Sequence, residues 1–178
     1  MSERITVDQF DQLYETFERT AWRWETQPAY HEPSEAEPFR RWRAGEPDDL
    51  EWLTGWLETL RAAHAAGRQF QRVRVHHDPL TVYQRWGLDV ITANVAAGED
   101  IRVLPIGKAR ELGVPGEDFC LFDDRSVALM FFGNEGMSGA ELITEAAEVA
   151  RYRQWSQSAW QHAIPFYQYR DNYFMRST

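Results

Sequence analysis

Arginine, tyrosine, asparagine and carboxylate side chains are concentrated between residues 72 and 102, and these residue types could bind a small anionic molecule. Arginines alternate with valines on a predicted strand over 69–76, and a helix is expected to begin just after it. Guanidinium groups near the N-terminus of a helix can hold a carboxylate or a phosphate. The candidate ligand-binding residues are Arg74, Tyr83, Arg85, Asn94, Glu99, Asp100 and Arg102.

The same segment has a purely structural interpretation, and the sequence leaves both open. Arginines at four positions could pair with nearby carboxylates and so fix a helix to the sheet. Surface ion pairs of this kind contribute about 0–1 kcal/mol each. The pairs would be drawn from Arg72, Arg74, Arg85 and Arg102 on one side and Asp78, Asp89, Glu99 and Asp100 on the other. In this interpretation Asn94 only caps a turn.

Known catalytic motifs are missing, so no catalytic residue is assigned and an enzyme is not favoured. The one lysine, Lys108, is followed by Ala109, which excludes a phosphate-binding Walker A loop. Ile106 stands where a His-x-Lys pair of the phospholipase-D type needs histidine. Cys120 lies between apolar residues on a predicted strand, as expected of an unreactive buried thiol. With one cysteine and no His-x-x-x-His spacing, we expect neither a metal nor a cofactor.

The composition is that of an acidic, aromatic-rich globular protein. The 178 residues carry a formal net charge of −9, and 14% of them are aromatic. Direct nucleic-acid binding is disfavoured because phosphate contacts need a positive surface. Disorder is disfavoured by the aromatic content. We find no apolar run long enough for a signal peptide or a membrane span, and we expect a cytoplasmic location.

Two regions are candidate interaction surfaces. Residues 1–60 hold 14 acidic and 6 basic residues, so the acid excess of the chain lies in its first third, which is the better candidate for a partner face. Seven aromatic residues lie between positions 155 and 174. This C-terminal segment could form a homodimer interface, because aromatic residues are favoured there. It could equally be ordinary core beneath a terminal helix.

Hydrophobic periodicity predicts one domain over residues 1–178. Helices are expected over 7–20, 35–43, 45–67, 78–87, 94–97, 107–112 and 144–163. Strands are expected over 21–29, 69–76, 101–104, 118–122, 126–132 and 138–143. The fold class is α+β: a mixed five- to six-stranded sheet with a C-terminal β-meander and helices packed on it.

Local signals mark where several elements begin and turn. Thr6 and Gln9 are spaced as a capping box. Asp78–Pro79 is typical of a helix start, with Pro79 as the first helical residue, and Gly87 is expected to interrupt that helix. Pro47 is expected near the start of another helix, and Asp123–Asp124 is expected to form a hairpin turn.

Several short motifs carry a family resemblance over nearly the whole chain. They are Glu37–Arg41, Phe70–Val75, Asp78–Tyr83, Asn94–Arg102, Asp118–Phe119 with Leu121–Asp123, Gly139–Leu142, and Ala159–Trp160 with His162–Pro165. On these motifs the chain resembles a family of small uncharacterised proteins from high-GC Gram-positive bacteria. The chain departs from the family at Trp86, often Phe, and at Leu88, often acidic, so no role for that acid is expected here.

The resemblance implies a domain of unknown function that is often encoded beside Cro/repressor-type helix-turn-helix regulators. It also implies a fold distantly similar to phospholipase-D-like domains, without their catalytic pair. We therefore expect a non-enzymatic regulatory or protein-interaction domain that works with a helix-turn-helix regulator. The alternative is a binding protein or enzyme for a small molecule bearing a phosphate or carboxylate, with an arginine-rich site.

Overall fold

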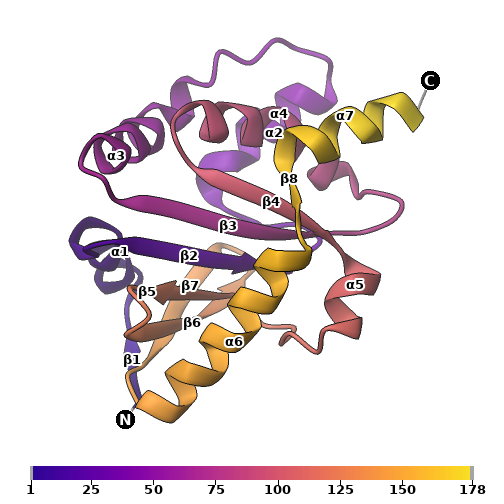
Figure 1. Cartoon of the computed structure of the whole chain (residues 1–178). Coiled ribbons are helices and arrows are strands. Elements are labelled where there is room, and N and C mark those ends of the chain that lie inside the picture. Colours follow the sequence, from indigo (N-terminus) through magenta and orange to yellow (C-terminus); the bar gives the residue numbers. More distant parts are fainter. Residues whose placement is uncertain (1, 177–178) are drawn as a thin grey trace.

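The computed structural model describes residues 2–176, which form one mixed β-sheet covered by helices on both faces (Figure 1). The strand order is β1-β7-β6-β5-β2-β3-β4-β8. The strands are β1 (Ser2–Ile5), β2 (Thr20–Glu25), β3 (Gln69–His76), β4 (Asp100–Pro105), β5 (Phe119–Phe122), β6 (Ser126–Gly133), β7 (Gly136–Ile143) and β8 (Ile164–Pro165). The helices are α1 (Val7–Thr16), α2 (Pro33–Arg43), η1 (Glu51–Leu53), α3 (Thr54–Ala65), α4 (Val82–Ala96), α5 (Ile106–Glu111), α6 (Ala146–His162) and α7 (Phe166–Arg176).

The sheet has a parallel centre and antiparallel flanks. β3 pairs in parallel with β2 and with β4, while β2 pairs with β5 in the antiparallel direction. β5, β6 and β7 form the predicted meander. The α+β class and the mixed sheet are confirmed, but the predicted size was too small. The described residues contain eight strands, because β1 and β8 add one strand at each edge.

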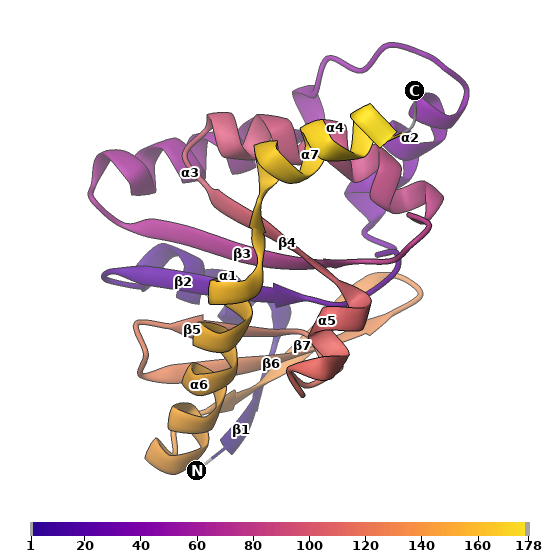
Figure 2. The ribbon, with the colours of Figure 1, turned by 45° about the vertical axis from the view of Figure 1, so that its right-hand side comes forward.

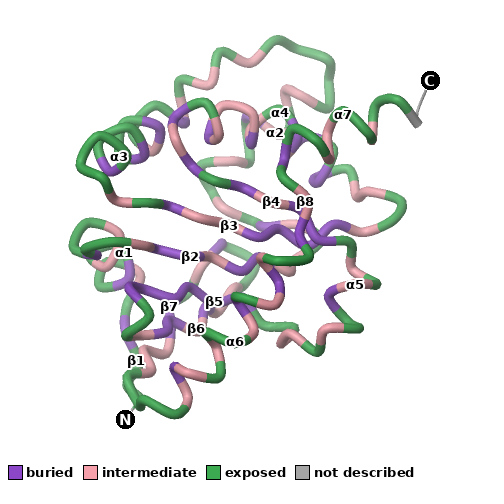
Figure 3. The backbone as a smooth tube through the Cα atoms, viewed as in Figure 1, coloured by how far each residue is buried: buried purple, intermediate pink, exposed green. Residues whose placement is uncertain are grey.

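Alternating side chains place two different cores on the two faces of the sheet. Trp22 and Trp24 of β2 point to the face covered by α5 and α6, together with Val73 and Val75 of β3. Figure 2 shows these two helices in front of the strands. The opposite face carries Phe70 and is covered by α1, α3 and α4. Burial follows this layering, because the central strands are largely buried and the outer surfaces of the helices are exposed (Figure 3).

Two capping boxes define the starts of α1 and α4. The predicted box at Thr6 and Gln9 is confirmed, with the Gln9 amide donating to the Thr6 hydroxyl at 3.2 Å. A second box uses Thr81 as the N-cap of α4, so the predicted start at Asp78–Pro79 was wrong. Gly87 does not interrupt α4, because the helix is continuous from Val82 to Ala96. The long predicted helix over 45–67 likewise begins later, at Thr54.

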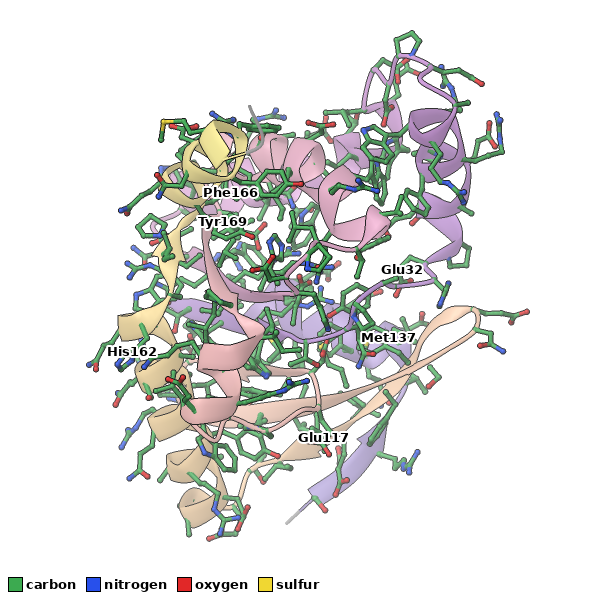
Figure 4. The ribbon with its side chains drawn as sticks, turned by 90° about the vertical axis from the view of Figure 1, so that its right-hand side faces the viewer. Glu32, Glu117, Met137, His162, Phe166 and Tyr169 are labelled. Carbon is green, nitrogen blue, oxygen red and sulfur yellow. The ribbon has the colours of Figure 1, made fainter. Side chains whose placement is uncertain are left out.

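The meander and the C-terminus complete the sheet. Asp123 and Asp124 both adopt positive φ and form the predicted two-residue turn. Beyond Pro165 the chain continues as α7, which the sequence analysis missed. The buried Phe166 side chain at its start (Figure 4) packs against α4 and β4. Tyr167 and Phe174 are exposed. Among residues 2–176, no helix combines the length and apolar character needed to cross a bilayer.

Candidate functional site

Four charged residues of β2 and β3 meet on the sheet face that α1, α3 and α4 cover. The parallel register places Arg23 opposite Arg72 and Glu25 opposite Arg74. Because side chains alternate along a strand, all four project to the same face. The Glu25 carboxylate lies 3.1 Å from Arg23 Nε, 2.9 Å from Arg72 Nη1 and 2.6 Å from Arg74 Nη1. One carboxylate is therefore shared by three guanidinium groups.

A second carboxylate, that of Glu99, joins this cluster. We call the cluster of Arg23, Arg72, Arg74, Glu25 and Glu99 the guanidinium floor. Arg72 Nε donates to Glu99 Oε1 at 2.8 Å. Glu25, Arg74 and Glu99 are only 2%, 5% and 3% exposed, respectively. The floor thus holds three largely buried positive groups against two buried carboxylates. Burying a charge without a partner is costly, so the excess positive charge is a strong electrostatic feature of this face.

The two carboxylates differ in how they ionise. Burial raises the pKa of Glu25, but Arg72, Arg23 and Arg74 outweigh burial and hold this pKa well below its ordinary value. Burial raises the pKa of Glu99 above its usual value, although Arg72 acts in the other direction. Glu25 therefore stays ionised more firmly than Glu99, and a proton on Glu99 would increase the positive charge of the floor.

Several polar atoms of this region have no hydrogen-bond partner among the described residues. Arg74 Nη2, Glu99 Oε2 and Asn94 Oδ1 are buried and unpartnered. Arg23 contacts Glu25 only through Nε, and its side chain is 20% exposed, the largest value among the arginines of the floor. In most proteins such groups are paired. Buried polar side chains with unused hydrogen-bonding capacity are candidates for contacts with a polar ligand.

The floor opens into a cavity of about 400 Å³. Small-molecule sites usually measure roughly 300–1,000 Å³, so this volume suits a compact organic molecule. All three arginines and Glu25 line it. Aromatic residues form much of the remaining wall, namely Phe10, Tyr14, Tyr30, Trp52, Trp56, Tyr83, Trp86 and Phe132.

Two tyrosines fix the position of Arg74 in the guanidinium floor. The Arg74 guanidinium carbon lies 4.9 Å from the centre of the Tyr30 ring and 5.4 Å from that of Tyr83. The Tyr83 hydroxyl donates to Glu35 Oε2 at 2.6 Å, and the Tyr30 hydroxyl donates to Asp118. Cation–π contacts therefore hold the guanidinium while hydrogen bonds orient both rings.

Three acidic residues, which we call the acidic wall, also line the cavity. Asp11 of α1, Glu32 at the N-cap of α2 and Glu35 in the first turn of α2 are all lining residues. The Met137 amide donates to Glu32 Oε1 at 3.0 Å, which joins the segment before α2 to the β6–β7 hairpin (Figure 4). Burial raises the pKa of Glu35 although Tyr83 hydrogen-bonds to it. The site therefore combines a positive floor with an acidic wall.

The structure brings together four of the seven predicted ligand-binding residues. Arg74, Tyr83 and Asn94 line the cavity, and Glu99 lies behind it, bound to Arg72. The other three lie elsewhere. Arg85 and Asp100 are exposed and are not lining residues.

Arg102 lies on the opposite face of the sheet. Its guanidinium carbon is 3.9 Å from the centre of the Trp160 ring, and Nη1 donates to the Trp160 carbonyl at 3.1 Å. Ile101, not Arg102, is the register partner of Arg72, so Ile101 faces the arginine side. The alternative of a structural ion-pair network is present in part. Arg72 pairs with Glu99, whereas Arg102 only approaches Asp100 at 4.0 Å.

The sequence did not reveal that β2 pairs with the strand that carries Arg72 and Arg74. Arg23 and Glu25 alternate with Trp22 and Trp24 on β2. That alternation already indicates that the two charged side chains share a face opposite the tryptophans. It does not reveal which strand lies beside β2, and so the meeting of Glu25 with Arg74 could not be seen.

Cysteine and metal chemistry find no support in the described part of the chain. Burial raises the pKa of Cys120 to about 12, although Arg23 and Tyr14 act in the other direction, so the thiol stays protonated. Within residues 2–176 there is no group of three or more His, Cys, Asp or Glu side chains arranged to hold a metal ion.

A family model described as a domain of unknown function (DUF6879) matches residues 8–171. The chain belongs to this family. The match to DUF6879 covers every residue of the guanidinium floor and of the acidic wall. No curated protein matches the sequence.

Two solved structures are similar to this DUF6879 domain at low sequence identity. NucT from Helicobacter pylori superposes with a TM-score of 0.52 and 7% identity, covering 93% of this chain and 98% of its own. TrmBL2, titled an archaeal chromatin protein with a novel mode of DNA binding, gives a TM-score of 0.48 and 10% identity over 93% of this chain and 53% of its own. The likeness to NucT concerns the fold alone.

Proposed function

We propose that this protein binds a small molecule that bears a carboxylate or a phosphate, with the anionic group on the guanidinium floor. One observation carries the proposal: the buried Arg74 and the partly buried Arg23 and Arg72 share two carboxylates at the bottom of a cavity. An anion from a ligand would compensate the excess positive charge. Guanidinium groups suit this task because their planar donors match carboxylate and phosphate oxygens.

The polar atoms that lack partners support the same function. Arg23 and Arg72 are neighbours across two strands, and both line the cavity. Arg23 forms no hydrogen bond to a described residue, and Arg72 uses Nε and Nη1 only. Donors that face a cavity without protein acceptors can bind a ligand without breaking the interactions that hold the fold.

A binding experiment on Arg23 tests the proposal. Isothermal titration calorimetry with a panel of aromatic carboxylates and phosphonates would measure affinity for the wild-type protein, Arg23→Gln and the control Arg85→Gln. Loss of a charge-assisted hydrogen bond worth roughly 1.5–3 kcal/mol should weaken binding about 10-fold to 100-fold in Arg23→Gln. Arg85→Gln removes an exposed arginine outside the cavity and should bind like the wild type. Equal affinity of all three proteins would contradict the proposal.

The regulatory role implied by the family resemblance is compatible with ligand binding. A domain that binds a small molecule could report its presence to a helix-turn-helix regulator, and this partnership stays a prediction. Purification of the tagged protein, with and without the ligand, would test whether such a regulator is retained. A regulator that is never retained and whose DNA binding is unaffected by the protein would argue against the partnership.

A further inference from the structure

The carboxylates of the acidic wall form no ion pair among the described residues, although Arg74 acts on Glu35 from a greater distance. Asp11, Glu32 and Glu35 line the cavity, yet none of them takes part in an ion pair. Burial, followed by repulsion from Asp8, Glu15 and Glu32, raises the pKa of Asp11. Carboxylates that repel one another beside a cavity would be stabilised by a cation entering it.

Hydrogen-bond acceptors are also left unfilled around the cavity. The Asn94 side chain is 4% exposed and lines the cavity, and its Oδ1 has no donor among the described residues. Glu32 and Glu35 each accept one hydrogen bond, from the Met137 amide and the Tyr83 hydroxyl. A carboxylate has about four acceptor positions, so both retain capacity for a further donor. The acidic wall can therefore accept hydrogen bonds from N–H groups of a ligand, whereas the guanidinium floor donates hydrogen bonds to a ligand.

The two charged regions belong to different layers of the molecule. The arginines of the floor lie on strands β2 and β3, whereas Asp11 lies on α1 and Glu35 on α2. Aromatic side chains from α1, η1, α3 and α4 line the space that both regions share. A ligand that satisfies all three surroundings needs an anionic end, an apolar body and a cationic end.

We infer that the ligand is zwitterionic: its carboxylate or phosphate lies on the guanidinium floor, and a protonated amine lies at the acidic wall formed by Asp11, Glu32 and Glu35. This inference rests on the proposed function, because it assumes the same cavity and the same anion position. It adds the second charge, which distinguishes an amino-bearing ligand from a simple anion.

Matched probes that differ only in the amine test the inference. The first pair is 4-(aminomethyl)benzoate and 4-methylbenzoate, and the second is the corresponding pair of phenylphosphonates. Calorimetry at low ionic strength should give an affinity at least tenfold higher for the amine in one pair or both. The pair that binds more tightly distinguishes a carboxylate head group from a phosphate-like one.

Variants of the wall show whether the amine is recognised there. Asp11→Asn and Glu35→Gln preserve side-chain shape, and each should reduce the preference for the amine at least threefold. Glu58→Gln is the matched control, because it removes an exposed carboxylate of α3 that does not line the cavity. It should leave the preference unchanged, and circular dichroism would verify that every variant is folded.

The outcomes separate this inference from the proposed function. If methyl and amine probes bind equally well and Arg23→Gln weakens both, the anion site stands and the zwitterion is wrong. If the amine preference persists in both Asp11→Asn and Glu35→Gln, the acidic wall does not bind the amine and the inference is again wrong. If no probe of either pair binds to the wild-type protein, both the inference and the proposed function are contradicted.

Discussion

Arg74 donates from Nη1 to Glu25 Oε2 at 2.6 Å, and the two residues are direct register partners on the parallel strands β3 and β2. The pair is buried, and Glu25 also lies within ion-pair distance of Arg23 and Arg72. Its carboxylate therefore holds together three like charges that would otherwise repel one another across two strands.

Replacing this carboxylate should destabilise the protein severely. Glu25→Gln keeps the shape of the side chain but leaves three guanidinium groups, one buried and two partly buried, with Glu99 as their remaining carboxylate. Breaking a buried charge pair in this way typically costs about 3–5 kcal/mol. We expect a loss of this size in the free energy of unfolding, measured by urea denaturation. The double variant Glu25→Gln/Arg74→Met should recover part of it, and unchanged stability of Glu25→Gln would contradict this account of the floor.

His76 should make the protein less stable in mild acid. The ring is 2% exposed, and neither nitrogen has a hydrogen-bond partner among the described residues. Burial, together with Arg74 and His77, lowers the pKa of His76 to about 3, although Glu25 acts in the other direction. The unfolded chain takes up this proton near pH 6.5. The stability contributed by the neutral ring is therefore complete above pH 6.5 and is lost as the pH falls toward 3.

The variant His76→Phe isolates this contribution. One titrating group changes the free energy of unfolding by up to about 1.4 kcal/mol per pH unit within such a window. Urea denaturation at pH 7, 6, 5 and 4 should show that the free energy of unfolding falls less steeply with decreasing pH for His76→Phe than for the wild type. The exposed His31 serves as the control, because His31→Gln should retain the wild-type slope. Identical slopes for His76→Phe and the wild type would rule out this role of the ring.

Gly87 is a position where added volume should stabilise the helix. It lies within α4, lines the cavity, and a Cβ at this position would meet no atom within 4 Å. Alanine is more favourable than glycine in a helix by roughly 0.5–1 kcal/mol. We expect Gly87→Ala to raise the urea midpoint by a corresponding amount. Gly87→Leu should extend further into the cavity and weaken probe binding without unfolding the protein.

Gly98, just beyond the C-terminal end of α4, is a position where an added side chain should destabilise the protein. Its φ is +108°, and an added Cβ would lie 2.9 Å from His64 Cγ. Gly98→Ala should therefore lower the urea midpoint. A lower midpoint for Gly87→Ala as well would show that α4 does not tolerate volume at the cavity.

The hairpin between β5 and β6 offers a stabilising substitution. Asp124 has a φ of +59° and is exposed, whereas the side chain of Asp123 accepts hydrogen bonds from the amides of Glu18, Arg19 and Thr20. A type I′ turn favours glycine at its second central position. Asp124→Gly should raise the melting temperature by relieving strain worth about 1 kcal/mol.

The neighbouring position is the control for this turn. Asp123→Gly removes the three acceptor contacts and should lower the melting temperature despite the same backbone freedom. If both glycine variants raised it, the side chain of Asp123 would not be needed to join β2 to the turn.

Much of the fold followed from patterns that are local in the sequence. The alternation over 69–76 predicted β3 at its observed bounds, and the meander strands lay within two residues of their predicted ends. β1 could not be seen, because of its four residues only Ile5 is buried and the pairing with β7 uses backbone groups. β8 has two residues, too few for any periodicity.

The site was predicted less well because it depends on the pairing of distant strands. The placement of Arg72 and Arg74 on one side of β3 followed from alternation, but Glu25 became their partner only through the parallel register of β2. Arg102 lies on the other side of the sheet because its register partner on β3 is Val73, one residue away from Arg72. The acid excess of residues 1–60 stays a predicted partner face, but sequence reasoning did not show that Asp11, Glu25, Glu32 and Glu35 from this region line the cavity.

The central position of β2 governs when the protein can fold during synthesis. β2 pairs with β3 on one edge and with β5 on the other, and β1 pairs with β7. The first two strands therefore cannot complete their pairing until residues up to Ile143 have been synthesised. Contacts between segments so far apart slow folding. A nascent chain that stops before β5 exposes an open strand edge carrying the charges of β2, which is a surface for association with other chains. Productive folding therefore waits until the meander has left the ribosome.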